Sequence, residues 1–202
     1  MEPYIRVTGI VAPIDRPNLD TDQILPAEYL KRIERTGFGQ FLFKAWRFLP
    51  DGSPNPDFVL NQPNYRDATI LVTGPNFGSG SSREAAPWAL EDYGFRTIIG
   101  TSFADIFRNN CYQNGMLPVV LPQEAVDSIM EKAKTIPGYD VTVDLEQCLV
   151  SDSNELIGKF EIDSFRRDCL LRGLDDIDLT MEYENKITAY ERAHPLEKTS
   201  AT

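Results

Sequence analysis

The sequence predicts an α/β domain whose mixed sheet is built around β-α-β crossovers. Three short apolar segments predict strands near residues 69–73, 97–100 and 116–120, and helical patterns near 82–93 and 104–114 lie between them. This alternation indicates parallel strands that are joined by crossover helices. A chain of 202 residues, 42% of them hydrophobic and 25% charged, is long enough to bury one core, and nothing in it requires a second domain.

Additional strands are predicted outside this alternating unit. A first strand is expected over residues 5–12, and short strands over 141–144, 148–150 and 156–160 are expected to form a small second β layer. Before these short strands, apolar residues on one face of segment 126–133 predict a helix that ends at a Pro-Gly pair.

A last helix is predicted near the C-terminal end of the chain. Its apolar positions recur at helical spacing and are Leu179, Tyr183, Ile187 and Tyr190. Such a stripe favours a packing surface or a subunit contact over a cofactor site. We therefore expect one domain over residues 1–194, followed by a disordered tail over 195–202.

The composition argues against several classes of function. A net charge of −11 and a sequence pI near 4.6 disfavour binding to nucleic acid and to anionic membranes, both of which attract basic patches. The three cysteines, Cys111, Cys148 and Cys169, form no Cys-x-x-Cys pair, so no metal or cluster is expected on this chain. Because the sequence has neither a signal-peptide pattern nor a membrane-length apolar run, we expect a cytoplasmic protein.

The run Gly74–Leu90 carries the clearest functional signal. An apolar strand leads through a glycine-rich turn into a helix whose N-terminus is predicted near residues 80–82. Free backbone N–H groups and the positive end of the helix dipole favour a carboxylate or phosphate there. Arg83 could bind such an anion with two hydrogen bonds, and the hydroxyls of Ser81 and Ser82 are within reach.

Other interpretations of this run remain open on the residues alone. Ser81 or Ser82 could simply cap the helix, with Glu84 near the position of a capping-box acid. The run lacks the lysine of a P-loop and the third glycine of a dinucleotide fingerprint. A serine hydrolase would need a base, and the only histidine, His194, lies in a polar C-terminal segment.

Several motifs together resemble one known family. The run Asn76–Glu84 resembles the signature of the swivelling domain of the aconitase superfamily. The other motifs, which follow the order found in 3-isopropylmalate dehydratase small subunits, are Asn18–Lys31, Thr36–Gly39, Trp46–Leu49, Asp92–Phe95, Ser102–Arg108 and Asn114–Pro118. The resemblance covers residues 5–190 and implies an aconitase-type swivelling β/β/α domain.

The resemblance implies a hydro-lyase that isomerises 2-isopropylmalate and 3-isopropylmalate in leucine biosynthesis. The domain would act with a larger subunit that carries a [4Fe-4S] cluster, and this chain would bind no cofactor itself. Ser81 would remove the proton α to a carboxylate of the small dicarboxylate substrate. The N–H groups around Ser82 and the Arg83 guanidinium would stabilise the alkoxide, and Asp22 would lie near the active site.

Substrate contacts are expected, on the same resemblance, from Thr21, Gly80, Leu30, Lys31 and Arg83. An apolar Leu30 suits an alkyl substituent and Lys31 suits a further carboxylate, so these residues leave the substituent open; an isopropyl group fits the resemblance best. Taken alone, Asp20 and Asp22 could instead form a turn whose side chains cap their own backbone.

Two positions depart from the family pattern. Ala85 stands where the motif usually continues with histidine, and Ser79 stands where cysteine, threonine or alanine is common. The chain could therefore serve a related dehydratase acting on citraconate, methylmalate or dimethylmalate, or be a catalytically silent binding subunit. The presence of Ser81, Ser82 and Arg83 argues against a silent subunit. The stoichiometry with a large subunit and self-association cannot be deduced from the sequence.

Overall fold

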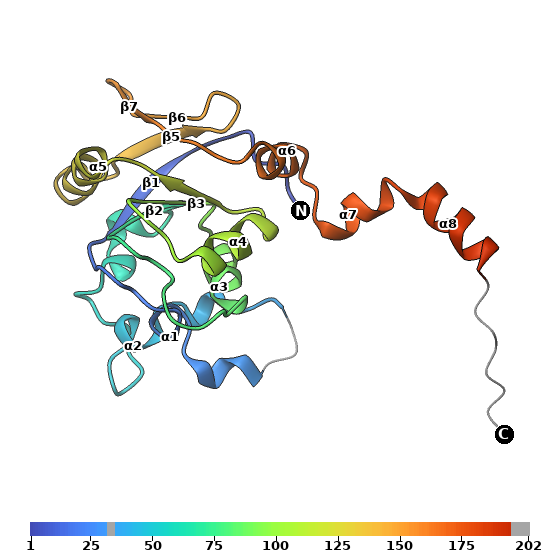
Figure 1. The fold of residues 1–202 in the computed structure, drawn as a ribbon. Helices are drawn as coiled ribbons and strands as arrows, with labels where there is room; N and C mark the ends of the chain where they lie inside the picture. Colours follow the sequence, from blue (N-terminus) through green and yellow to red (C-terminus); the bar gives the residue numbers. More distant parts are fainter. Residues whose placement is uncertain (32–34, 195–202) are drawn as a thin grey trace.

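One mixed sheet organises the molecule in the computed structural model, which describes residues 1–31 and 35–194 (Figure 1). The strand order is β4-β3-β2-β1-β5-β6-β7. The strands are β1 (Arg6–Ile14), β2 (Ile70–Thr73), β3 (Thr97–Gly100), β4 (Leu117–Val120), β5 (Asp140–Asp144), β6 (Leu149–Ser151) and β7 (Leu156–Lys159). Each segment that the sequence predicted as a strand is confirmed, with slightly shifted ends.

Helices connect the strands and cover the sheet. The α-helices are α1 (Thr21–Ile24), α2 (Lys44–Arg47), α3 (Ala85–Tyr93), α4 (Asp105–Gln113), α5 (Gln123–Thr135), α6 (Ser164–Arg172), α7 (Asp176–Met181) and α8 (Glu184–Ala193). Short 3-10 helices are η1 (Ala27–Lys31), η2 (Gly39–Phe41), η3 (Val59–Asn61) and η4 (Pro63–Tyr65). The predicted crossover helices correspond to α3 and α4, and the predicted one-faced helix corresponds to α5.

Strand β1 joins a parallel and an antiparallel half of the sheet. Its second half pairs in parallel with β2, with Val11 opposite Ile70. Its first half pairs antiparallel with β5, with Arg6 opposite Asp144. The strands that the sequence assigned to a small second β layer are present as β5, β6 and β7, but they continue the main sheet because β5 pairs with β1.

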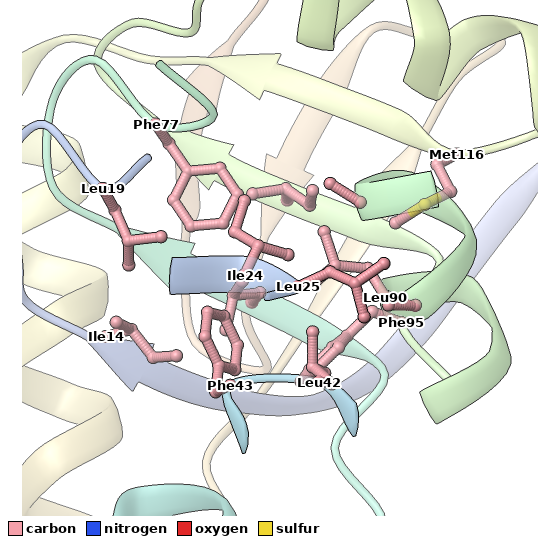
Figure 2. Close-up of a cluster of buried hydrophobic side chains, with 14 of the residues drawn as sticks. Ile14, Leu19, Ile24, Leu25, Leu42, Phe43, Phe77, Leu90, Phe95 and Met116 are labelled. Atoms are coloured by element: carbon pink, nitrogen blue, oxygen red, sulfur yellow. The ribbon is translucent and has the colours of Figure 1, made fainter. Parts of the chain in front are cut away.

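The parallel strands separate two hydrophobic cores, because successive side chains of a strand point to opposite faces. In β2, Leu71 packs in one core, whereas Ile70 and Val72 pack in the other. The first core holds α1, α3 and α4, and Figure 2 shows Ile24 of α1 and the next residue, Leu25, inserted into it. The second core holds α5 and the strands β5 and β6.

The loops that follow β1 and β2 lie at the same edge of the sheet. These strands are parallel neighbours, with Ile14 opposite Thr73 at their ends, and in α/β proteins this is the edge where ligands bind. Gly74, directly after β2, comes so close to the other loop that a Cβ atom there would lie 2.6 Å from the carbonyl oxygen of Arg16. The topology thus brings together two segments that are far apart in the sequence.

The C-terminal segment contains two helices where the sequence predicted one. The N–H of Tyr183 donates to the Thr180 carbonyl, a shorter step than the α-helical one, and α7 ends there before α8 begins. Figure 1 shows both helices (orange to red) extending away from the sheet. The tail predicted over 195–202 lies outside the described residues. Across the described ranges, no helix is long and apolar enough to span a membrane.

A buried carboxylate joins α5 to the antiparallel strands. The Asp152 side chain is 1% exposed and accepts hydrogen bonds from Lys132 Nζ (2.9 Å) and Tyr139 OH (3.0 Å). The backbone N–H groups of Asn154 and Glu155 also donate to it, at 2.8 and 3.0 Å. Burial alone would raise the pKa of Asp152, but these donors outweigh burial and lower the pKa from 3.8 to about 2.

We expect Asp152→Asn to lower the free energy of unfolding by about 2 kcal/mol at pH 7. Because the pKa of Asp152 is lower in the folded state, its charge stabilises the fold fully above pH 3.8, and this contribution is lost as the pH falls toward 2. Urea unfolding of both proteins at several pH values should show the difference shrinking in that window. Glu155→Gln is the control: it removes the exposed partner of Lys132 and should cost under about 0.5 kcal/mol. A difference independent of pH would contradict this account.

Candidate functional site

Backbone hydrogen bonds join the loop after β1 to the loop after β2, and the joined loops are called the platform below. The N–H of Gly78 donates to the Leu19 carbonyl at 2.8 Å, and the N–H of Thr21 donates to the Ser79 carbonyl at 2.9 Å. Asp20 and Ser79 form an isolated parallel bridge between these bonds. The glycine-rich loop therefore continues the parallel pairing of β1 and β2 beyond the ends of the strands.

Two asparagines, one from each loop, also join the platform through their side chains. Asn18 and Asn76 both have a left-handed backbone, with φ angles of 53° and 58°, a conformation that asparagine tolerates better than most residues. Their side chains meet, because Asn76 Nδ2 donates to Asn18 Oδ1 at 2.8 Å. Sequence reasoning missed their structural role. Their positions in the turns after β1 and β2 were the available signal.

The glycine-rich loop is shaped by close packing and by positive φ angles. Gly78 has a φ of +75°, and a Cβ atom there would lie 2.2 Å from Cγ of Phe107. Gly80 has a φ of +89°, but the atom nearest to a Cβ there would be Asp20 Cβ, at 3.3 Å, and Thr21 would lie at ordinary contact distance. Gly78 is thus required by conformation and by space, whereas Gly80 is required chiefly by conformation.

Helix α3 begins later than the sequence predicted. Its first residue is Ala85, so Ser81 and Ser82 lie in the preceding turn and not at the helix N-terminus. The Arg83 N–H bonds back to the Ser81 carbonyl at 2.8 Å, which keeps this segment out of the helical path. The capping interpretation was also wrong: Glu84 occupies the cap position, and no side chain caps the helix.

The hydroxyls of Ser81 and Ser82 are exposed at the surface of this turn. Within residues 1–31 and 35–194, neither hydroxyl makes a hydrogen bond, and the N–H groups of both serines lack a protein acceptor. The turn itself is held from below by Thr21, which is 1% exposed and donates from Oγ1 to the Ser81 carbonyl at 3.0 Å. Thr21 therefore supports the serine turn, and its hydroxyl is directed at the backbone of that turn.

Arg83 is fixed by an ion pair across the two loops. Its Nη2 donates to Asp22 Oδ2 at 2.7 Å, its Nη1 pairs with Asp22 Oδ1, and Nη1 also reaches the Leu25 carbonyl at 3.4 Å. The hydrogen bond from Arg83 lowers the pKa of Asp22 below 3.8 and keeps it ionised. A guanidinium has five N–H groups, so, among the residues that the structure describes, Nε and one N–H of Nη2 have no partner and remain for a ligand. Those two donors can bind one carboxylate in a fork.

The structure separates the predicted residues of the first loop by role. Asp20 caps α1 through a hydrogen bond to the Gln23 N–H, as the turn interpretation proposed, whereas Asp22 pairs with Arg83. Leu30 and Lys31 are exposed on η1, and within residues 1–31 and 35–194 no hydrogen bond or ion pair joins them to the serines.

The position that departs from the family pattern, Ala85, is 6% exposed and packs in the first core. It is the first residue of α3 and follows the serine turn in the sequence. A larger side chain at this position would have to displace its buried neighbours.

The described residues offer no site for a metal or cluster. No group of three or more His, Cys, Asp or Glu side chains among them could hold a metal ion. Cys111 and Cys169 are buried, and burial raises the pKa of both thiols, which disfavours the thiolate form that binds metals. The chemistry that these loops offer is the binding of an anion next to free hydroxyl and N–H groups.

The chain is similar to known proteins along most of its length. A family model of the aconitase C-terminal domain matches residues 1–124, and a second model, LeuD_N, matches residues 127–164. The 3-isopropylmalate dehydratase small subunit of Brevibacillus brevis is 56% identical over 191 residues, which are 95% of this chain and 98% of that protein. The chain belongs to the family of 3-isopropylmalate dehydratase small subunits. The family member from Koribacter versatilis is 58% identical, with 93% of this chain and 96% of that protein aligned.

A solved structure of the same family shares the fold. The crystal structure of 3-isopropylmalate dehydratase from Methanocaldococcus jannaschii superposes with a TM-score of 0.68 and covers 92% of this chain and 99% of that chain. Its sequence identity is 22%, so this likeness concerns the fold alone. It confirms the predicted α/β fold class, while the high identity of the bacterial family members confirms the predicted family.

Proposed function

We propose that this chain is the small subunit of a heteromeric hydro-lyase that interconverts 2-isopropylmalate and 3-isopropylmalate in leucine biosynthesis. The observation that carries the proposal is the exposed Ser81 beside an Arg83 with two donors that have no partner in the described part of the chain. The chain is also 56–58% identical to family members of that name. We assign the enzyme to the cytoplasm and treat residues 1–194 as its swivelling domain.

In the proposed mechanism, Ser81 Oγ takes the proton from the carbon α to a substrate carboxylate and returns it in the reverse direction. A neutral serine hydroxyl is too weak a base for this step, so Ser81 must act as the alkoxide, which the site stabilises and which becomes the hydroxyl when it takes the proton. The Ser82 N–H and the Arg83 guanidinium provide this stabilisation. Arg83 also binds the substrate carboxylate through Nε and Nη2, while Asp22 holds the guanidinium in position.

The remaining chemistry is assigned to the large subunit. A [4Fe-4S] cluster on that subunit supplies a Lewis acid for the substrate hydroxyl and carboxylate. Gly80, Leu30 and Lys31 remain proposed substrate contacts, with Leu30 facing the isopropyl group. Because Leu30 and Lys31 lie on the exposed η1, closure of the large subunit over this loop would bring them to the substrate. For Thr21, support of the serine turn is the favoured role.

The proposal is tested by anaerobic reconstitution of the chain with its iron-sulfur large subunit. Ultraviolet absorbance follows the unsaturated acid, which forms from isopropylmalate, methylmalate or dimethylmalate and is consumed when citraconate is the substrate. Faster turnover of isopropylmalate than of the others supports the proposed function. Faster turnover of another acid would reassign the chain to a related dehydratase. Complex formation without turnover of any of these acids would indicate a silent binding subunit.

We expect Thr21→Val to lower kcat about 10-fold with little change in KM, because the serine turn loses a buried support and Ser81 is misplaced. The lost hydrogen bond should also reduce the free energy of unfolding by about 1 kcal/mol. Thr8→Val is the matched control, since it removes a similar hydroxyl from an exposed pair with Thr142. Turnover assays of the reconstituted enzyme and urea unfolding of the chain measure both effects. An unchanged kcat in Thr21→Val would refute the supporting role.

A further inference from the structure

The segment α7–α8, called the arm below, presents apolar side chains to solvent. Its large exposed hydrophobic residues are Ile177, Met181, Tyr183, Ile187 and Tyr190. The side chains of Ile177 and Tyr190 are 72% and 65% exposed. A row of such residues is unusual for a surface that stays in contact with water. Figure 1 shows that the arm reaches away from the two cores, so the fold does not cover this row.

A groove lies between Glu84, the residue after Arg83, and the base of the arm. It has a volume of about 450 Å³ and lies between α3 and the start of α7. Glu84 and Glu91 line one wall, and Asp175, Asp176 and Ile177 line the other. Glu84 follows Arg83 directly in the sequence, so the groove begins one residue from the candidate functional site and reaches Ile177, the first apolar residue of the arm.

The charge of this surface indicates the kind of partner that covers it. The groove has four carboxylates against the Arg35 guanidinium and the Met1 ammonium. The arm itself carries five carboxylates and two cations, a net charge of −3. A second copy would bring the same negative surface and be repelled, whereas a different protein with basic residues around apolar ones would be attracted.

We infer that the arm and the groove at its base form a docking surface for the large subunit, separate from the residues that act on substrate. This inference rests on the proposed function, which requires a large subunit to close over Ser81 and Arg83. A partner seated at the serine turn is adjacent to Glu84 and can extend along the groove. The apolar row then becomes a buried interface, and the carboxylates pair with cations of the large subunit.

The test compares two substitutions that add one negative charge to the same helix. Ile187→Asp places it in the apolar row, and Asn185→Asp places it about half a helical turn away, on the other face of α8. Sedimentation velocity or interferometry with the intact large subunit, without substrate, gives the Kd. We expect Ile187→Asp to raise the Kd at least 30-fold, and Asn185→Asp to stay within about 3-fold of the unaltered chain. Thermal unfolding of each chain should be unchanged, because both positions are exposed.

The outcomes separate this inference from the proposed function. An unchanged Kd for Ile187→Asp, with normal turnover, would overturn the docking surface and leave the hydro-lyase intact. Self-association of the unaltered chain that Ile187→Asp abolishes would overturn it in favour of a second copy. Conversely, a raised Kd in a complex that turns over no dicarboxylate would support the docking surface while refuting the proposed function. With excess large subunit, Ile187→Asp should recover the kcat of the unaltered enzyme.

Discussion

Replacing Ser81 by alanine is expected to lower kcat of the reconstituted enzyme about 10³-fold, because the proposed base is removed. The Ser81 hydroxyl is exposed and makes no hydrogen bond in the described part of the chain. The free energy of unfolding should therefore change by less than about 0.5 kcal/mol, and the Kd for the large subunit should stay the same. Turnover assays, urea unfolding and sedimentation velocity measure these three quantities.

Ser82→Ala is the control for this experiment, because it removes the same group one position further on. Its backbone N–H remains, so the proposed stabilisation of the alkoxide is retained, and kcat should fall by no more than about 10-fold. A larger loss in Ser82→Ala than in Ser81→Ala would assign the base to Ser82. Equal and small losses would show that neither hydroxyl takes the proton.

Replacing Gly78 by alanine is expected to reduce the free energy of unfolding by about 3 kcal/mol or more. The new Cβ atom would lie 2.2 Å from the ring of Phe107, and the residue would keep a φ of +75°. Phe107 is buried against Phe77 in the first core, so the ring cannot move without disturbing the platform of the serine turn. Urea unfolding measures the loss directly.

Gly80→Ala separates the two causes of that loss. It carries the same positive-φ penalty at +89°, but the atom nearest to its Cβ would be Asp20 Cβ, at 3.3 Å. We expect a loss of about 1 kcal/mol. Equal losses at the two positions would mean that Phe107 yields to the extra atom, and that conformation alone requires glycine in this loop.

The sheet and its crossover helices could be predicted because they follow from local patterns. Continuous apolar runs such as Ile70–Val72 indicate a strand buried on both faces, and the structure places that strand between the two cores. The glycine-rich turn and the Ser-Ser-Arg run were found for the same reason, since their residue types have narrow conformational and chemical uses.

What could not be predicted depends on contacts between distant segments. The start of α3 was placed too early because the pattern around Ser81 and Ser82 suits a helix cap, and only the bonds to Thr21 and within the turn hold it away from the helix. The pairing of Asn18 with Asn76 and the support from Thr21 likewise require two loops to meet in space. The break between α7 and α8 near Tyr183 leaves the helical spacing of apolar residues intact on both sides, so this spacing could not reveal it.

The position of β1 between both halves of the sheet has a consequence for how the chain folds. This strand is synthesised before either of its neighbours, yet its edges are satisfied only when β2 and β5 arrive, and β5 lies more than a hundred residues later, as the pair Arg6 and Asp144 shows. Until then, its backbone N–H and C=O groups must be hydrogen-bonded to water. Loop closure over such separations is slow. The two cores should therefore form together in a late, cooperative step. Strand β1, although it is synthesised first, should be among the last strands to complete its hydrogen bonds.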